Sequence, residues 1–210
     1  MTAGAPESGT RTAPFAEPFA RFGEVLARAR AEKEIREPTA MSIATVGEDG
    51  RPSLRMVLLK EFDERGFVFY TNLGSRKARE LRANPNAALC FHYQPFEVQV
   101  RIEGRVEPVS DAEADAYYAS RPRGSRVGAW ASIQSTPLPS YDLLVHRVEE
   151  FDARFGPTGD IPRPAFWSGF RVVPGAIEFW QGMPSRLHQR DVYTLVPGEP
   201  PRWMLGHLYP

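Results

Sequence analysis

The feature that most constrains the fold of this chain is a succession of short strand-like segments joined by turns. Val98, Val100 and Ile102 alternate with polar neighbours, which is the period of a half-buried strand. Asp49-Gly50 separates two such segments and is a strong hairpin signal. The pattern predicts about nine strands, at residues 41–46, 54–62, 67–71, 86–93, 98–109, 169–173, 176–180, 187–196 and 202–208.

Helical patterns interrupt these strands. The first places Phe15, Phe19, Phe22, Leu26 and Ala29 on one stripe of a helix. Hairpin connections leave sheet edges that closure into a barrel would hide, so we expect a mainly β (α+β) fold, an antiparallel barrel with peripheral helices. The other helices are predicted at 75–83 with Ser75 as cap, after the capping box Ser110–Glu113, and at 140–155 with Leu144, Val148, Phe151 and Phe155 on one face.

Composition and charge exclude several classes of protein. The 210 residues are 42% hydrophobic and carry no net charge, which argues against a general nucleic-acid coat or a polybasic membrane binder. No stretch approaches the ~20 apolar residues of a membrane-spanning helix. Residues 1–14 are rich in Gly, Ala, Ser, Thr and Pro, without the apolar core of a signal peptide. We expect a flexible tail at 1–14, a single domain at 15–210, no membrane association and a cytoplasmic location.

Common cofactor and catalytic motifs are missing from the sequence. It contains no G-x-G-x-x-G, P-loop, H-E-x-x-H or G-x-S-x-G, so Rossmann, NTPase, zincin and hydrolase interpretations lose their usual support. A lone Cys90 excludes a disulfide framework and a cysteine-based zinc site. Four histidines without metal-ligand spacing predict no metal site.

Two cations stand at the start of a predicted helix, where the fold should disfavour them. Arg76 and Lys77 follow the cap Ser75, and a helix N-terminus already carries partial positive charge and free N–H groups. A bound phosphate would remove the conflict, because it suits both the amides and the side chains. The alternative is a pair of solvated cations on an exposed turn.

A second group of cations lies near the C-terminus. Arg186, His188 and Arg190 would share one face of an extended segment. There they would receive an anionic ligand and offer an imidazole for proton transfer. The alternative is an exposed polar strand face, balanced by Asp191 or Glu178.

Further charged and aromatic segments point the same way. Residues 121–126 predict a basic turn suited to phosphate, or an ordinary surface turn. Arg55 and Lys60 bracket an apolar strand, where a cation snorkels or pairs. Residues 179–182 would wall a planar ligand unless Trp180 belongs to the core. Cationic clusters among aromatic strands of a neutral protein suit one or two planar, phosphorylated ligands.

Ten short motifs occur in order between about Glu37 and the C-terminus. They are Arg55-Met-Val-Leu-Leu-Lys60, Phe69-Tyr-Thr-Asn72, Ser75-Arg-Lys77, Asn84-Pro85, Gln99-Val-Arg101, Ser120-Arg-Pro-Arg123, Gly128-Ala129, Gln134-Ser135, Glu178-Phe-Trp-Gln-Gly182 and Arg186-Leu-His188. Together they resemble the pyridoxine/pyridoxamine 5′-phosphate oxidase family. The resemblance implies an FMN-binding split β-barrel and a homodimer with FMN at the subunit interface.

The resemblance also implies two sets of ligand-binding residues. The FMN site would consist of Arg55, Met56, Val57, Leu58, Leu59, Lys60, Tyr70, Thr71, Arg76, Lys77, Gln99, Gln134, Ser135, Trp180 and Arg190. The substrate would be bound by Lys60, Tyr117, Arg121 and Ser125 at its phosphate, and by Arg186 and His188 at its ring. Arg186 and His188 would be the catalytic pair, Arg186 orienting the substrate and His188 serving as an orienting group or proton partner.

The implied reaction is oxidation of pyridoxine or pyridoxamine 5′-phosphate at C4′ to pyridoxal 5′-phosphate, in vitamin B6 salvage. FMN would take a hydride equivalent and O₂ would reoxidise it, which gives hydrogen peroxide. The alternatives are a related FMN oxidase of another ring substrate such as a phenazine precursor, a non-catalytic flavin or pyridoxal-phosphate binder, and an RNA-binding barrel. The expected phosphate pocket argues against the phenazine precursor, and the zero net charge argues against RNA.

The sequence departs from the family pattern near the expected substrate. Gln189 stands where Asp is usual, and Glu97 replaces an Arg. His207 and Tyr209 alter the usual Arg-Leu-x-Pro ending, whereas Glu37 matches an acidic position near the substrate. These departures concern closure over the substrate more than FMN binding.

Overall fold

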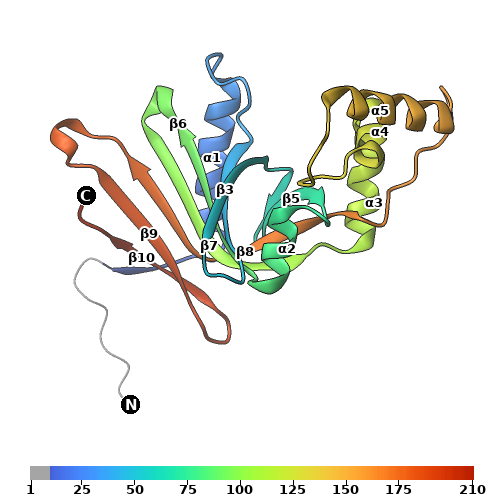
Figure 1. Ribbon diagram of the computed structural model, residues 1–210. Coiled ribbons are helices and arrows are strands. Elements are labelled where there is room, and N and C mark those ends of the chain that lie inside the picture. The colour runs from blue at the N-terminus through green and yellow to red at the C-terminus, as the bar shows by residue number, and fades with distance from the viewer. Residues whose placement is uncertain (1–9) are drawn as a thin grey trace.

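The computed structural model describes residues 10–210, which build a ten-stranded antiparallel sheet (Figure 1). Residues 1–9, part of the predicted tail, lie outside the described residues. The mainly β, antiparallel architecture with peripheral helices is as predicted. The strands are β1 (Arg11–Ala13), β2 (Ala40–Val46), β3 (Pro52–Leu58), β4 (Glu61–Asp63), β5 (Gly66–Asn72), β6 (Asn86–Tyr93), β7 (Val98–Pro108), β8 (Trp167–Gln181), β9 (Gln189–Val196) and β10 (Arg202–His207).

Five α-helices accompany the sheet in the described part of the chain. Figure 1 shows α3, α4 and α5 gathered on one side of the molecule, opposite β9 and β10. Across residues 10–210, no helix combines the length and apolar character needed to cross a membrane. The helices are α1 (Glu17–Ala31), α2 (Arg76–Ala83), α3 (Asp111–Ser120), α4 (Arg123–Ala131) and α5 (Tyr141–Phe155), with short 3₁₀ turns η1 (Gln94–Phe96) and η2 (Pro184–Arg186).

Strand β8 pairs with three other strands, β5, β7 and β9. Residues 167–172 pair with β5, residues 176–181 pair with β9, and β7 runs beside both halves. The register shifts between Glu103 and Gly104. A Cβ at Gly104 would lie 2.0 Å from the carbonyl oxygen of Val173, so this close approach requires glycine. The sheet therefore divides along β8, and each half of that strand serves a different part of the barrel.

Helix α1 fills the core with its predicted apolar stripe. The four stripe residues within the helix are all buried. Phe22 is fully buried, and its ring centroid lies 4.9–5.0 Å from those of Phe62, Phe67 and Phe91. These aromatic contacts attach α1 to strands β4, β5 and β6.

Helix α3 is fixed to the sheet by its own cap. The predicted capping box is present, with Ser110 accepting from the Glu113 backbone N–H while the Glu113 carboxylate accepts from that of Ser110. The same carboxylate accepts a hydrogen bond from Arg171 of β8 at 2.6 Å. The Glu113 side chain thus caps the start of the helix and joins it to the central strand.

The structure corrects three predicted boundaries. Residues 11–13 form β1 and pair with β10, so the prediction of a flexible tail is wrong from Arg11 onward. The strand predicted at 54–62 is interrupted at Leu59 and Lys60. The strands predicted at 169–173 and 176–180 are one continuous strand, because the bulge lets β8 bend without ending.

Two predictions near the expected site are also wrong. The basic turn at 121–126 becomes a helix from Arg123 onward, since Pro122 provides the extended N-cap conformation that starts α4. The strand predicted from residue 187 begins only at Gln189. Ser185 and Arg186 have φ values of 58° and 62°, and this left-handed turn takes Arg186 off the expected strand face.

Candidate active site

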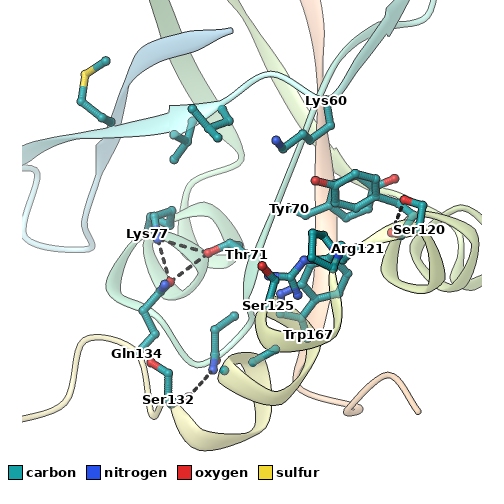
Figure 2. A pocket seen from close by; sticks show the side chains of 18 residues that line it. Lys60, Tyr70, Thr71, Lys77, Ser120, Arg121, Ser125, Ser132, Gln134 and Trp167 are labelled. Carbon is teal, nitrogen blue, oxygen red and sulfur yellow. Dashed lines mark hydrogen bonds between the residues drawn. The ribbon is translucent and has the colours of Figure 1, made fainter. Parts of the chain in front are cut away.

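A cavity of about 670 Å³ lies between the sheet and helices α2, α3 and α4 (Figure 2). This volume suits a small organic ligand or cofactor. Residues from β3, β5 and the first position of β8 meet side chains from the three helices here. The lining residues are Met56, Val57, Leu58, Lys60, Tyr70, Thr71, Asn72, Lys77, Tyr117, Ser120, Arg121, Pro122, Ser125, Gly128, Ala129, Ser132, Gln134 and Trp167.

Lys77 occupies one end of this cavity. Ser75 caps α2 as predicted, which places Lys77 in the first helical turn. The Lys77 Nζ donates to Thr71 Oγ1 at 3.1 Å and to Gln134 Oε1 at 2.9 Å (Figure 2). The residue is 9% exposed, and within residues 10–210 it forms no ion pair. Its charge is therefore buried among neutral partners only.

The charge on Lys77 is unfavourable in this setting. Burial, followed by repulsion from the Arg55 guanidinium, lowers the pKa of Lys77 to about 8. An anion entering the cavity would stabilise the ammonium form and accept a hydrogen bond from it. A phosphate group fits this end because helix N-terminal amides and a lysine favour the same ligand.

Arg121 provides a second positive centre in the cavity. Burial lowers its pKa, and its Nη1 is buried without a hydrogen-bond partner in the described structure. Its guanidinium lies 4.7 Å from the ring centroid of Trp167. Lys60 and Ser125 line the same region (Figure 2). The cavity thus offers two separate positions to anionic groups.

An aromatic wall stands beside this second centre. The rings of Tyr70 and Tyr117 stack at 4.1 Å, and those of Tyr70 and Trp167 at 5.3 Å. Burial, reinforced by the charges of Glu61 and Glu113, raises the pKa of Tyr70 to about 12. Its phenol therefore stays protonated at neutral pH, and the wall presents a neutral surface to a planar ligand.

Glu80 forms ion pairs with two other cations near Lys77, which are Arg55 and Arg76. Its carboxylate accepts from Thr45, Ser53 and Arg76 at 2.5–2.7 Å and from Arg55 at 3.1 Å. Burial alone would raise the pKa of Glu80, but these hydrogen bonds outweigh it and lower the pKa to about 2. Arg55 and Arg76 thereby share one carboxylate, whereas Lys77 forms no ion pair within residues 10–210.

A second group of predicted site residues lies elsewhere on the sheet. Gln99, Trp180 and Arg190 are directly paired across β7, β8 and β9. The His188 ring lies 4.5 Å from that of Trp180, and its Nδ1 accepts a hydrogen bond from the Met183 N–H. Since Nδ1 is the acceptor, the neutral ring carries its proton on Nε2.

The charge of Arg190 is balanced within this second group. Glu178 accepts two hydrogen bonds from Arg190, at 2.8 and 3.0 Å, and this confirms one of the two partners proposed for it. Asp191 instead pairs with Arg21 and with His207. Arg190 thus has a carboxylate partner although Gln189 replaces the usual Asp.

The structure brings together some of the predicted residues and separates others. Arg55 and Arg76 pair with Glu80 beside the cavity. Leu59 is buried in the core. Ser135 follows the lining residue Gln134 and has a φ of 68°. Lining the cavity are Met56, Val57, Leu58, Lys60, Tyr70, Thr71, Lys77, Gln134, Tyr117, Arg121 and Ser125. Away from it are Gln99, Trp180, Arg186, His188 and Arg190.

Several lining residues were not identified from the sequence. Trp167 stacks on Arg121, and Asn72 donates to the Ser132 carbonyl at 3.2 Å. A tryptophan at the first position of a strand carries no local signal of ligand contact. Only the pairing of β8 with β5 places Trp167 in the wall.

Comparisons with known proteins agree with this architecture. Residues 27–155 match the sequence profile of pyridoxamine 5′-phosphate oxidase. Residues 167–210 match that of the pyridoxine 5′-phosphate oxidase C-terminal dimerisation region.

Close relatives cover nearly the whole chain. Pyridoxine/pyridoxamine 5′-phosphate oxidase of Myxococcus xanthus (strain DK1622) is 57% identical over 194 residues, 92% of each chain. The protein of that name from Brucella canis is 55% identical over 195 residues, 93% of this chain and 95% of the relative.

Solved structures show the same fold. PhzG from Burkholderia lata 383, in complex with tetrahydrophenazine-1-carboxylic acid, has a TM-score of 0.84 at 31% identity, covering 92% of each chain. A related FMN-binding protein from Nostoc punctiforme has a TM-score of 0.73 at 18% identity, covering 94% of this chain and 98% of the other, and supports the fold alone.

The fold defines a split β-barrel protein whose cavity carries two cations, Lys77 and Arg121, and an aromatic wall. The sequence matches identify the group of split barrels concerned. This chain belongs to the pyridoxine/pyridoxamine 5′-phosphate oxidase family of oxidoreductases.

The Glu80 cluster predicts a specific acid sensitivity. Because the folded pKa of about 2 lies below the ordinary value of 4.5, the carboxylate stabilises the fold fully above pH 4.5. That contribution is lost as the pH falls from 4.5 towards 2. We expect Glu80→Gln to lower the free energy of unfolding at pH 7 by about 2–3 kcal/mol.

Urea unfolding between pH 3 and 7 measures this effect. Glu64→Gln, at an exposed position, is the matched control and should leave both stability and its acid dependence unchanged. Equal loss of stability between pH 5 and 3 in wild type and Glu80→Gln would contradict the assignment.

Proposed function

We propose that this chain oxidises pyridoxine 5′-phosphate and pyridoxamine 5′-phosphate to pyridoxal 5′-phosphate, with FMN as cofactor and O₂ as electron acceptor. The observation that carries the proposal is one cavity with two positive centres, Lys77 and Arg121, neither of which forms an ion pair within residues 10–210. Two phosphorylated ligands would each supply one anion. Membership of the oxidase family and the names of the relatives support the same substrates.

The Lys77 end is the proposed FMN phosphate site. Its buried ammonium, the first turn of α2 and the hydroxyl of Thr71 form a donor-rich cradle. The segment Met56–Leu58, whose side chains are apolar, lines the adjacent wall, which suits a flat ring system. When bound, FMN supplies the acceptor for the hydride equivalent leaving C4′ and passes the electrons to O₂, which yields hydrogen peroxide.

The Arg121 end is the proposed substrate phosphate site. Lys60 and Ser125 add a second cation and a hydroxyl to the unpartnered guanidinium N–H groups of Arg121. Charge-assisted hydrogen bonds from these groups would fix the substrate at one end. The Tyr117 ring would then limit where the pyridine ring lies.

We further propose that a second copy of the chain completes each site. The group containing Trp180, His188 and Arg190 lies on the half of β8 that pairs with β9, whereas the cavity lies at the other end of that strand. Two copies in a symmetric homodimer would bring each cavity against the partner's second group. The match of residues 167–210 to a dimerisation region supports this arrangement.

His188 and Arg186 are the proposed catalytic pair. His188 keeps Nε2 free because Nδ1 is held by the Met183 N–H, so it can orient or exchange a proton with the reacting amine or alcohol. Arg186 is exposed, and it forms no ion pair within the described chain. Its charge is therefore free to orient the substrate oxygen.

A phenazine precursor is the second candidate substrate. The related PhzG structure holds tetrahydrophenazine-1-carboxylic acid, a planar anion without a phosphate. The aromatic wall suits such a ring, but a carboxylate provides less charge for the two cations Lys60 and Arg121. We therefore favour the phosphorylated substrates.

A visible spectrum followed by anaerobic addition of pyridoxamine 5′-phosphate tests the function. We expect a yellow protein whose flavin absorbance bleaches, and one peroxide per pyridoxal 5′-phosphate after air is admitted. A tetrahydrophenazine acid should bleach it more slowly. Bleaching by the phenazine compound alone would favour the second candidate, and a yellow protein that neither compound bleaches would indicate a non-catalytic binder.

Replacing Lys77 tests the FMN phosphate site. We expect Lys77→Met to weaken FMN binding by about 10- to 150-fold, because one charge-assisted hydrogen bond to phosphate is lost. Lys33→Met, at an exposed position, is the control. Since the pKa of Lys77 is about 8, wild-type FMN affinity should fall as the pH rises above 8, and the variant should lose this dependence. Fluorescence titration of apoprotein measures both, and unchanged affinity in Lys77→Met would disprove the site.

Replacing the proposed catalytic pair separates chemistry from cofactor binding. We expect Arg186→Met and His188→Asn to lower kcat by about 100-fold or more while each variant retains its FMN. Arg51→Met and His146→Asn, both at exposed side chains, are the controls. Steady-state kinetics with flavin content measured in parallel decides the matter, and wild-type kcat in both variants would remove the assigned roles.

A further inference from the structure

Arg121 is held in an unusual way for a partly buried arginine. It lies against two adjacent aromatic rings, with its Cζ 4.7 Å from the centroid of Trp167 and 5.6 Å from that of Tyr118. Both rings are almost fully buried, at 5% and 2% exposure. The rings of Trp167 and Tyr118 meet edge to face at 5.0 Å, so they form one packed aromatic support.

Two arginines near Arg121 are held by carboxylates instead. Arg163 pairs with Asp111 and Asp115, and Arg123 pairs with Asp152. Within residues 10–210, Arg121 has no such ion pair, and its Nη1 is buried without a hydrogen-bond partner. Arg123 and Arg163 are absent from the cavity lining, whereas Arg121 is part of it.

The two kinds of support have different consequences for binding. A carboxylate fixes a guanidinium firmly but neutralises its charge and occupies its N–H groups. An aromatic face fixes the plane of the guanidinium while leaving all of its in-plane donors free. Arg121 consequently keeps both its charge and its hydrogen-bonding capacity for a ligand.

Trp167 is itself firmly placed. Its backbone pairs with Asn72 at the end of β5, and its carbonyl accepts from Arg163 at 2.9 Å. Its ring is nearly parallel to that of Tyr70, with an interplanar angle of 4°. Figure 2 shows Trp167 and Arg121 together at the side of the cavity, with Ser125 next to them.

We propose that Trp167 is a positioning residue for substrate phosphate, acting through Arg121. Its indole ring, with Tyr118 packed beside it, holds the guanidinium in the cavity wall without occupying its N–H groups. This inference rests on the proposed function of the cavity. It adds that substrate affinity depends on an aromatic side chain that supplies no hydrogen bond to the phosphate.

The test compares Trp167→Leu and Trp167→Phe in the FMN-loaded enzyme. We expect Trp167→Leu to raise KM for pyridoxamine 5′-phosphate by about 3- to 30-fold, the range of a desolvated cation–π contact, with kcat within about twofold and FMN content unchanged. Trp167→Phe should show a smaller rise, because it keeps a ring. Trp130→Leu, an aromatic replacement outside the cavity lining, should leave KM unchanged.

A double-mutant cycle with Arg121→Lys separates positioning from general loosening of the fold. If Trp167 acts through Arg121, Trp167→Leu raises KM little further once Arg121 is Lys, since a lysine has no planar fork to be oriented. Full additivity of the two substitutions would overturn the inference. So would an equal rise of KM in Trp130→Leu.

Binding of inorganic phosphate keeps this test independent of turnover. We expect Trp167→Leu to weaken the binding of phosphate to the FMN-loaded protein. Binding is measured as protection of the remaining tryptophan fluorescence from quenching by iodide. Where the enzyme turns over, inhibition by phosphate measures the same binding. If wild type does not oxidise pyridoxamine 5′-phosphate but binds phosphate more tightly than Trp167→Leu does, the proposed function fails and the Trp167 inference stands. If Trp167→Leu binds phosphate as wild type does, the inference fails.

Discussion

Two positive charges without carboxylate partners, buried at Lys77 and partly buried at Arg121, determine what the cavity accepts. Lys77 is surrounded by hydroxyl and amide oxygens, and Arg121 by aromatic rings. Burial penalises both charges, as their lowered pKa values show, and neither the helices nor the strands of the described chain compensate it. Anions entering the cavity are therefore favoured at two places, and a neutral planar molecule is favoured at neither.

The other cations near these positions have carboxylate partners within the fold. Glu80 forms ion pairs with Arg55 and Arg76. Glu178 pairs with Arg190, and Glu113 pairs with Arg171. Each carboxylate also joins two or more elements of structure. The net charge of the sequence is zero, but the charges are unevenly distributed over the structure. Carboxylates pair with cations of the scaffold, whereas the cations that line the cavity, where ligands would bind, have no carboxylate partner among the described residues.

Much of this could be predicted from the sequence, for physical reasons that also explain the errors. Alternation at Val98–Ile102 and the caps at Ser75 and Ser110 are local signals, and each was confirmed. The start of α4 at Arg123 was missed because Pro122 resembles a turn residue as much as an N-cap. Trp167 was missed because its role arises from pairing between distant strands, and the partners of Arg55 and Arg190 depend on tertiary contacts in the same way.

The length of β8 has a consequence for how such a protein responds to dilution. Trp167 and Trp180 belong to the same strand, and thirteen residues of extended chain span roughly 40 Å. A single subunit cannot fold both ends onto one small molecule. If two subunits share each site, ligand and subunit association are thermodynamically linked, so that cofactor occupancy falls when the protein is diluted and excess cofactor holds the subunits together.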